Sequence, residues 1–152
     1  MIKKTQVKNS SPEAPPQKIV EMLIKHYRTG NFEAAKKLAT SLSLEFPNHQ
    51  FGWKVLGVIL QQTDKFEESL FPMQKSVELL PDDAEAHSNL GVTLLDLGKL
   101  SEARESFMNA LKLNPSFAQA YNNLGNTFLN LGKLDDAKEN YKKAITFNEM
   151  IK

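Results

Sequence analysis

The chain has 152 residues, with nineteen lysine or arginine residues against eighteen aspartate or glutamate residues and a formal net charge of +1. This near-neutral balance argues against a nucleic-acid binding protein, in which basic residues cluster on one face. Cysteine is absent, which excludes disulfide scaffolds, thiolate zinc sites and thiol nucleophiles. Residues 1–17 contain no apolar core of a secretory leader. No apolar run reaches the ~18 residues of a membrane span, so we expect a cytoplasmic protein that stays out of membranes.

The first fifteen residues differ in composition from the rest of the chain. They are polar and contain Ser10-Ser11-Pro12 and the first proline of a Pro15-Pro16 pair. A segment with so few large apolar residues cannot bury enough surface to fold. We therefore expect residues 1–15 to form a disordered tail ahead of the folded domain.

The remainder of the chain repeats itself every 34 residues. Pro47, Pro81 and Pro115 stand at this interval. Aligning residues 84–117 with residues 118–151 gives fifteen identities in 34 positions, many more than chance would give. The repeat predicts one domain over residues 16–151, divided into units 16–49, 50–83, 84–117 and 118–151.

Each unit is predicted to form two helices. From Tyr121 to Leu131, large apolar side chains recur every three or four positions, and Gly132 follows where a helix C-terminus favours a left-handed residue. A second apolar series runs from Leu134 to Ile145. Side chains that cap the first helices are expected just before them, at Asn48, Asp82, Asp83 and Ser116.

Two features within the helices carry packing predictions. Gly91 and Ala103 fall on the two helices of one unit, and their small size is expected to let the two backbones approach closely. Pro72 lies inside the second helix of residues 50–83, where it removes one backbone hydrogen bond and should bend the helix.

The spacing and the residue types together resemble the tetratricopeptide repeat (TPR) family. Unit 84–117 carries the family motif, unit 50–83 departs from it at Asp64 and Ser69, and unit 16–49 matches least and is expected to be an N-terminal cap. The resemblance implies an all-α, right-handed superhelical solenoid of four antiparallel helix pairs, with the first helix of each pair lining a concave groove. The last unit carries the motif at Tyr121, Leu124-Gly125, Phe128, Gly132, Ala137, Tyr141 and Ala144.

Residues that could support catalysis or hold a metal have simpler roles in a helical repeat. His26, His49 and His87 are the only histidines, and no two have the i, i+4 spacing of a helical metal site. His87 stands at an aromatic position of the repeat and is expected to pack as a core imidazole. Acidic pairs such as Asp135-Asp136 fall at helix N-termini, where the helix dipole stabilises negative charge. We expect no enzyme activity, no catalytic residue, no metal and no cofactor.

The resemblance places function in the groove, at repeat positions 2, 5, 6, 9, 12 and 13. In the first two units these positions hold aliphatic and aromatic residues with single charges, and in the last unit they hold mostly asparagine. An amide both donates and accepts, so it can pair with a peptide backbone irrespective of sequence. We predict a protein–protein interaction module that binds a peptide or partner protein in the groove. Its predicted polar contacts are Lys54, Asn89, Asn122, Asn123, Asn126 and Asn130.

Two more specific TPR functions can be compared with these residues. Asn89 and Asn123 share repeat position 6 and resemble the asparagine ladder of O-linked N-acetylglucosamine transferase, although asparagine is also common there in the family consensus. The carboxylate clamp that binds chaperone C-termini matches at Lys54 and Asn89, but its two distal cations fall on Gln119 and Asn123. Without those charge-assisted partners, we expect no tight binding of a terminal carboxylate.

Two alternatives stay open. The chain could be the substrate-recruiting TPR region of a larger bacterial enzyme, such as a glycosyltransferase or sulfotransferase, which a reading frame continuing past Lys152 would show. It could instead be an assembly scaffold that self-associates through the outer face of the last helix, at Tyr141, Ile145 and Phe147, because no further helix covers this face.

Overall fold

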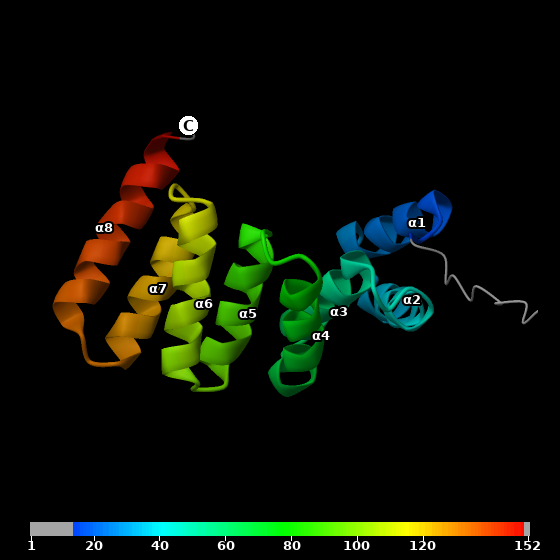
Figure 1. Ribbon diagram of the computed structural model, residues 1–152, viewed down its shortest axis with the longest axis horizontal. Coiled ribbons are helices and arrows are strands. Elements are labelled where there is room, and N and C mark those ends of the chain that lie inside the picture. Colours follow the sequence, from blue (N-terminus) through cyan, green and yellow to red (C-terminus); the bar gives the residue numbers. More distant parts are fainter. Residues whose placement is uncertain (1–13, 151–152) are drawn as a thin grey trace, which may run out of the picture.

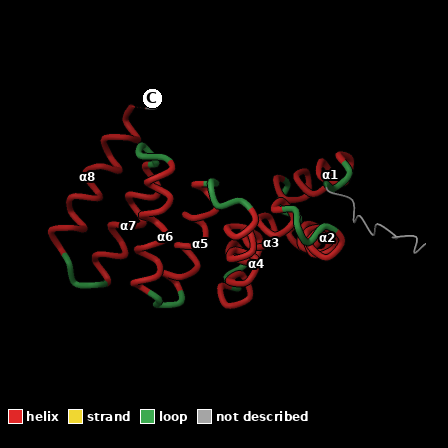
Figure 2. Tube along the Cα trace, in the orientation of Figure 1, coloured by secondary structure: helices red, strands yellow, loops and turns green. Residues whose placement is uncertain are grey.

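The computed structural model describes residues 14–150, and eight α-helices lie within them. The helices follow one another in chain order along the long axis of the molecule (Figure 1). Figure 2 shows that only short loops connect them, and no strand occurs in the described range. The helices are α1 (Gln17–Arg28), α2 (Phe32–Glu45), α3 (Gln50–Gln62), α4 (Phe66–Leu79), α5 (Ala84–Asp96), α6 (Leu100–Leu113), α7 (Ala118–Asn130) and α8 (Leu134–Met150).

Neighbouring helices pack as a stack rather than around one centre. The second helix of each pair contacts the first helix of the next pair: α2 packs on α3, α4 on α5, and α6 on α7. First helices also contact each other, α3 with α5 and α5 with α7. The buried side chains form separate clusters, one that includes Leu23, Leu42 and Ile59 and another that includes Leu94 and Phe107. The predicted all-α solenoid is confirmed.

The turns inside the helix pairs share one backbone conformation. Gly30, Gly98 and Gly132 have φ angles of 75°, 73° and 74°, a left-handed region that glycine adopts without steric cost. Asp64 stands at the corresponding position of the second repeat with a φ of 58°. In each turn the next residue donates its N–H to a helix carbonyl five residues back, as Lys99 does to Leu94 at 2.8 Å. The departure from the motif at Asp64 therefore keeps the turn but places a strained residue in it.

The glycines at repeat position 8, Gly57, Gly91 and Gly125, make room for a large side chain, whereas Gly52 lies against the backbone of Ser43 in α2. A Cβ added to Gly91 would lie 2.6 Å from the ring of Phe107, and one added to Gly125 would lie 2.7 Å from the ring of Tyr141. Both rings belong to the second helix of the same pair. The predicted pairing of Gly91 with Ala103 for close backbone approach is therefore wrong in its reason, because the ring of Phe107 fills that space.

Helix capping agrees with the prediction at only one first helix. Asp83 is the N-cap of α5, and its carboxylate accepts from the N–H of Ala86 at 3.2 Å. His49, not Asn48, caps α3 through its Nδ1, and Phe117, not Ser116, occupies the N-cap position of α7. The predicted caps Asn48 and Ser116 are therefore wrong by one residue.

One hydrogen bond recurs at the fourth position of three repeats. Trp53 Nε1, His87 Nε2 and the Tyr121 hydroxyl lie 2.9, 2.7 and 3.0 Å from the carbonyl oxygen of the proline six residues earlier. A carbonyl can only accept, so Nε2 of His87 carries the proton. His87 is half-buried at a repeat boundary rather than packed in the core as predicted, because its ring joins its helix to the preceding loop.

The remaining predictions concern Pro72, the N-terminal tail, membrane-spanning helices, the division into repeats and the location of the protein. The helix α4 continues through Pro72, which is buried within it. The predicted tail, residues 1–15, lies outside the described residues except for Ala14 and Pro15. Among the described helices none is long and apolar enough to cross a membrane. The division of the chain into a tail and four repeats, and the cytoplasmic location, stay predictions.

Candidate functional site

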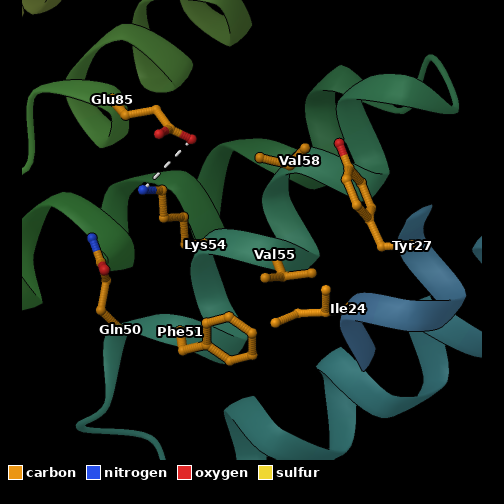
Figure 3. Close-up of a pocket in the computed structure, with 8 residues that line it drawn as sticks. All are labelled: Ile24, Tyr27, Gln50, Phe51, Lys54, Val55, Val58 and Glu85. Atoms are coloured by element: carbon orange, nitrogen blue, oxygen red, sulfur yellow. Dashed lines mark ion pairs between the residues drawn. The ribbon is translucent and has the colours of Figure 1, made fainter. Parts of the chain in front are cut away.

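A hollow of about 330 Å³ opens between α1 and α3. Figure 3 shows apolar side chains from these two helices on one side of it and polar side chains toward α5 on the other. All lining residues except Gln50 occupy repeat positions that the sequence assigns to the groove. The lining residues are Ile24, Tyr27, Gln50, Phe51, Lys54, Val55, Val58 and Glu85.

The apolar side of the hollow is held in place by contacts behind it. The Tyr27 hydroxyl accepts a hydrogen bond from Nε2 of Gln62 at 2.6 Å, which ties α1 to the end of α3. The ring of Tyr27 also packs edge-on against Phe32, with 6.0 Å between ring centroids. The wall is therefore fixed before any ligand arrives, which lowers the entropic cost of binding.

The polar side is organised by Asp83, the N-cap of α5. Its Oδ2 lies 2.8 Å from Nζ of Lys54 and accepts from Nε2 of Gln50 at 2.9 Å. The Lys54 ammonium also lies 3.6 Å from a carboxylate oxygen of Glu85. Burial opposes ionisation of Asp83, but hydrogen bonds from Lys54, Gln50 and the backbone of Ala86 outweigh it and lower the pKa of Asp83 below its ordinary value of 3.8.

The six predicted contact residues do not gather at one place. Lys54 alone lines the hollow, and its charge is already paired with Asp83. Asn126 accepts a hydrogen bond from the Tyr141 hydroxyl at 2.5 Å, and Nδ2 of Asn89 is buried without an acceptor among the described residues. The remaining three lie farther along the groove on α7: Asn123 is half-buried, and Asn122 and Asn130 are exposed.

A second hollow, of about 550 Å³, lies between α7 and α8 at the C-terminal end of the stack. Of the three residues predicted for self-association, only Ile145 is largely exposed, at 60%. Tyr141 turns inward over Gly125, and Phe147 stacks on the ring of Tyr121 with 5.4 Å between centroids. The hollow is lined by Ala118, Gln119, Asn122, Tyr141, Ala144, Ile145 and Asn148.

Sequence reasoning missed the role of Gln50 and Asp83 in the site. Both are polar residues at a repeat boundary, and their contact with Lys54 joins α3 to the start of α5. A signal was present, because Lys54 at repeat position 5 precedes by 29 residues the aspartate that caps the first helix of the next repeat. Within residues 14–150, no three His, Asp or Glu side chains come together as metal ligands would.

A stack of paired helices with a groove of this kind defines a helical-repeat protein of the class that serves as a protein-interaction or scaffold module. Comparison with family models makes the class specific. A model described as a TPR repeat matches residues 93–132, and two described as a tetratricopeptide repeat match residues 118–150 and 73–105. Together they span residues 73–150, more than half of the chain, and the chain belongs to the tetratricopeptide repeat family.

Solved structures of MamA proteins share this fold. "MamA MSR-1" is 25% identical with a TM-score of 0.77, over 88% of this chain and 77% of that one. "MamA AMB-1" is 25% identical with a TM-score of 0.78, over 86% and 78% of the two chains. MamA from Desulfovibrio magneticus RS-1 is 20% identical with a TM-score of 0.81, over 90% and 77%, a likeness that shows the fold alone. None of the curated proteins matches the chain.

Proposed function

We propose that the groove lined by the first helices binds an extended segment of a partner protein, and that the chain catalyses no reaction. The observation that supports this function is the hollow between α1 and α3, because its residues come almost entirely from groove positions. Ligand sites commonly combine mostly apolar walls with a few placed polar groups, as this hollow does.

The asparagine-rich part of the groove supplies the second contact in this proposal. Asn122, Asn123 and Asn130 offer amide groups that can pair with a peptide backbone. Asn126 accepts the Tyr141 hydroxyl at Oδ1 and keeps the two N–H donors of Nδ2 for a ligand, whereas the Nδ2 group of Asn89 is buried and would have to turn outward to donate. A segment that enters at the hollow and continues toward α7 would use both ends of the groove.

A peptide selection tests the proposal. A phage-displayed library of random peptides is selected on the protein, and the enriched sequences are synthesised with blocked ends and titrated by calorimetry. Val58→Gln places an amide in the apolar wall and should lower the affinity for the selected peptides about tenfold or more. The matched control is Val77→Gln, a half-buried valine of α4 that lies outside the hollow, and it should leave affinity unchanged.

The asparagine contacts are tested by a second variant. The double change Asn89→Ala and Asn123→Ala should weaken the same peptides without lowering the melting temperature much, and Asn109→Ala on α6 is the control. If selection enriches no peptide, or if Val58→Gln and Val77→Gln bind equally well, the groove does not have this function.

Self-association through the C-terminal face is a second candidate, favoured by the hollow between α7 and α8. The geometry restricts how copies could meet. Within the stack, a first helix packs on the preceding helix through its repeat positions 3 and 10. In α5 these positions hold the buried residues Ala86 and Thr93, and the Thr93 hydroxyl lies 2.8 Å from that of Ser69 on α4. In α1 the same positions hold Lys18 and Lys25, both exposed. Stacking α1 into the hollow would bury two ammonium groups, so two copies would instead meet through their C-terminal faces.

Sedimentation distinguishes this candidate. Ile145→Glu should abolish any concentration-dependent increase in mass, whereas Leu134→Glu should not, because Leu134 is 65% exposed at the start of α8 but does not line the hollow. A constant monomer mass for the unmodified chain over its whole concentration range would exclude self-association.

A further inference from the structure

We infer that the hollow between α1 and α3 selects peptide segments in which a bulky apolar side chain stands a few residues from a lysine or arginine. This inference rests on the proposed function and names the chemistry of the partner. The apolar side chain would enter the hollow, and the cation would lie against the carboxylate of Glu85 on α5.

The preference for a bulky apolar side chain in the ligand follows from the shape and lining of the hollow. Ile24 and Tyr27 on α1 and Phe51, Val55 and Val58 on α3 gather on one side of it (Figure 3). Each of the five is only partly buried, so apolar surface stays in contact with water. The volume of about 330 Å³ lies at the lower end of the ~300–1,000 Å³ found for ligand pockets. It therefore suits one or two large side chains rather than a folded element.

The preference for a basic residue in the ligand follows from the ion pairs of Lys54. Its ammonium lies between two carboxylates, 2.8 Å from Asp83 and 3.6 Å from Glu85, and the Lys54 side chain is 21% exposed. The Asp83 side chain is 16% exposed, is hydrogen-bonded on both oxygens and stays ionised. One cation against two anions leaves this side of the hollow with one net negative charge.

Glu85 is where that negative charge is accessible. Its side chain is 65% exposed, and its only ion-pair partner in the described part of the chain is Lys54, at the longer of the two distances. The other charges at groove positions of α1 are Glu21 and Arg28, which have opposite signs and offset each other. A ligand cation therefore finds a complementary partner at Glu85, whereas a ligand carboxylate meets two anions and a lysine that is already paired.

The order of the elements sets the spacing in the ligand. The apolar side chain would sit between α1 and α3, and the cation would reach α5, one helix farther along the groove. Packed helices lie ~8–10 Å apart and an extended chain advances ~3.3–3.6 Å per residue, so the two ligand residues would be about two to four positions apart.

The peptides enriched by the selection test this inference. A bulky apolar residue with lysine or arginine two to four positions away should recur among them. In calorimetry with blocked peptides, replacing the basic residue by Gln should weaken binding about threefold to tenfold, and replacing it by Glu should weaken it further. Glu85→Lys should reverse this order, so that the peptide containing Glu binds best.

A matched control separates charge recognition from helix stability. Glu102→Lys removes the acidic residue of the first turn of α6, as Glu85→Lys does in α5, but Glu102 lies outside the hollow. Glu102→Lys should leave the order of the three peptides unchanged. Circular dichroism establishes that both variants are folded before they are titrated.

The possible failures are distinguishable. If Val58→Gln weakens all three peptides but the unmodified protein binds them equally, the groove binds peptides and the charge selection is wrong. The same conclusion follows if Glu85→Lys and Glu102→Lys act alike. If the selection enriches no peptide, the proposed function and this inference are both overturned.

Discussion

Asp83 offers the most direct test of how two repeats are joined. It caps α5 through the N–H of Ala86, and it accepts hydrogen bonds from Lys54 and Gln50 of α3. Replacing Asp83 by Ala removes an N-cap, which costs about 1 kcal/mol. It also removes the bonds from Lys54 and Gln50, which together contribute about 1–2 kcal/mol after allowance for the partial exposure of Lys54.

The expected loss is therefore about 2–3 kcal/mol of unfolding free energy, or a fall in the melting temperature of about 5–10 °C. Urea unfolding followed by circular dichroism at 222 nm measures the free energy, and thermal unfolding gives the second value. Asp82→Ala is the matched control, because Asp82 is the neighbouring aspartate and is exposed. It should change stability by less than about 0.5 kcal/mol.

A double-mutant cycle separates the cap from the contact with Lys54. Lys54→Met, Asp83→Ala and the combined variant should give a coupling energy of at least about 0.5 kcal/mol, since the two side chains are in direct contact. If Asp83→Ala is no worse than Asp82→Ala, or if the coupling energy is zero, the reasoning about this junction is refuted.

Three further predictions follow from single residues. Because the pKa of Asp83 is lowered in the folded state, the contribution of its charge to the unfolding free energy is fully present above its ordinary pKa of 3.8 and is lost as the pH falls through the folded-state pKa. When the unfolding free energy is measured against pH in acid, it should therefore fall less steeply in Asp83→Ala than in the unmodified protein. Asp64→Gly should raise the unfolding free energy by about 0.5–1 kcal/mol in urea, because glycine adopts a φ of 58° without strain, and a loss of stability would show that the Asp64 side chain contributes more than its backbone costs. Gly91→Ala should lower the unfolding free energy by about 1–3 kcal/mol through its clash with the ring of Phe107, so an unchanged midpoint would mean that the ring moves aside freely.

The sequence predicts the helix pairs because the signals that form them are local and repeated. The turn residues Gly98 and Gly132 and the apolar spacing within each unit follow from the chain without any knowledge of tertiary contacts. The hydrogen bond from the ring at repeat position 4 to the preceding proline carbonyl is also predictable from the sequence. A donor-bearing ring at Trp53, His87 and Tyr121 follows a proline by six residues each time, a fixed distance that a shared contact explains.

The candidate site is less predictable, because it depends on how side chains from different repeats meet. The sequence places positions of α1 and α3 along a groove, but nothing in their residue types predicts that a hollow opens between the two helices. The sequence predicts that Lys54 contacts a ligand. Only the position of Asp83 at the start of α5 shows that the Lys54 ammonium is already paired within the protein. The sequence likewise predicts Asn126 as a ligand contact, but it does not show that the Tyr141 ring, placed over Gly125, brings its hydroxyl to the Asn126 amide.

The paired state of Lys54 links the stability of the stack to the chemistry of the groove. A free lysine at this position would favour acidic ligands, as the carboxylate clamp does, but Asp83 draws the ammonium into the junction between α3 and α5. Its charge is therefore used to join two repeats, and the accessible charge of the hollow becomes that of Glu85. In the proposed binding mode, the same aspartate that caps α5 thus sets the sign of the accessible charge at the hollow, and moving this one capping contact would change the ligand preference we propose without altering the fold.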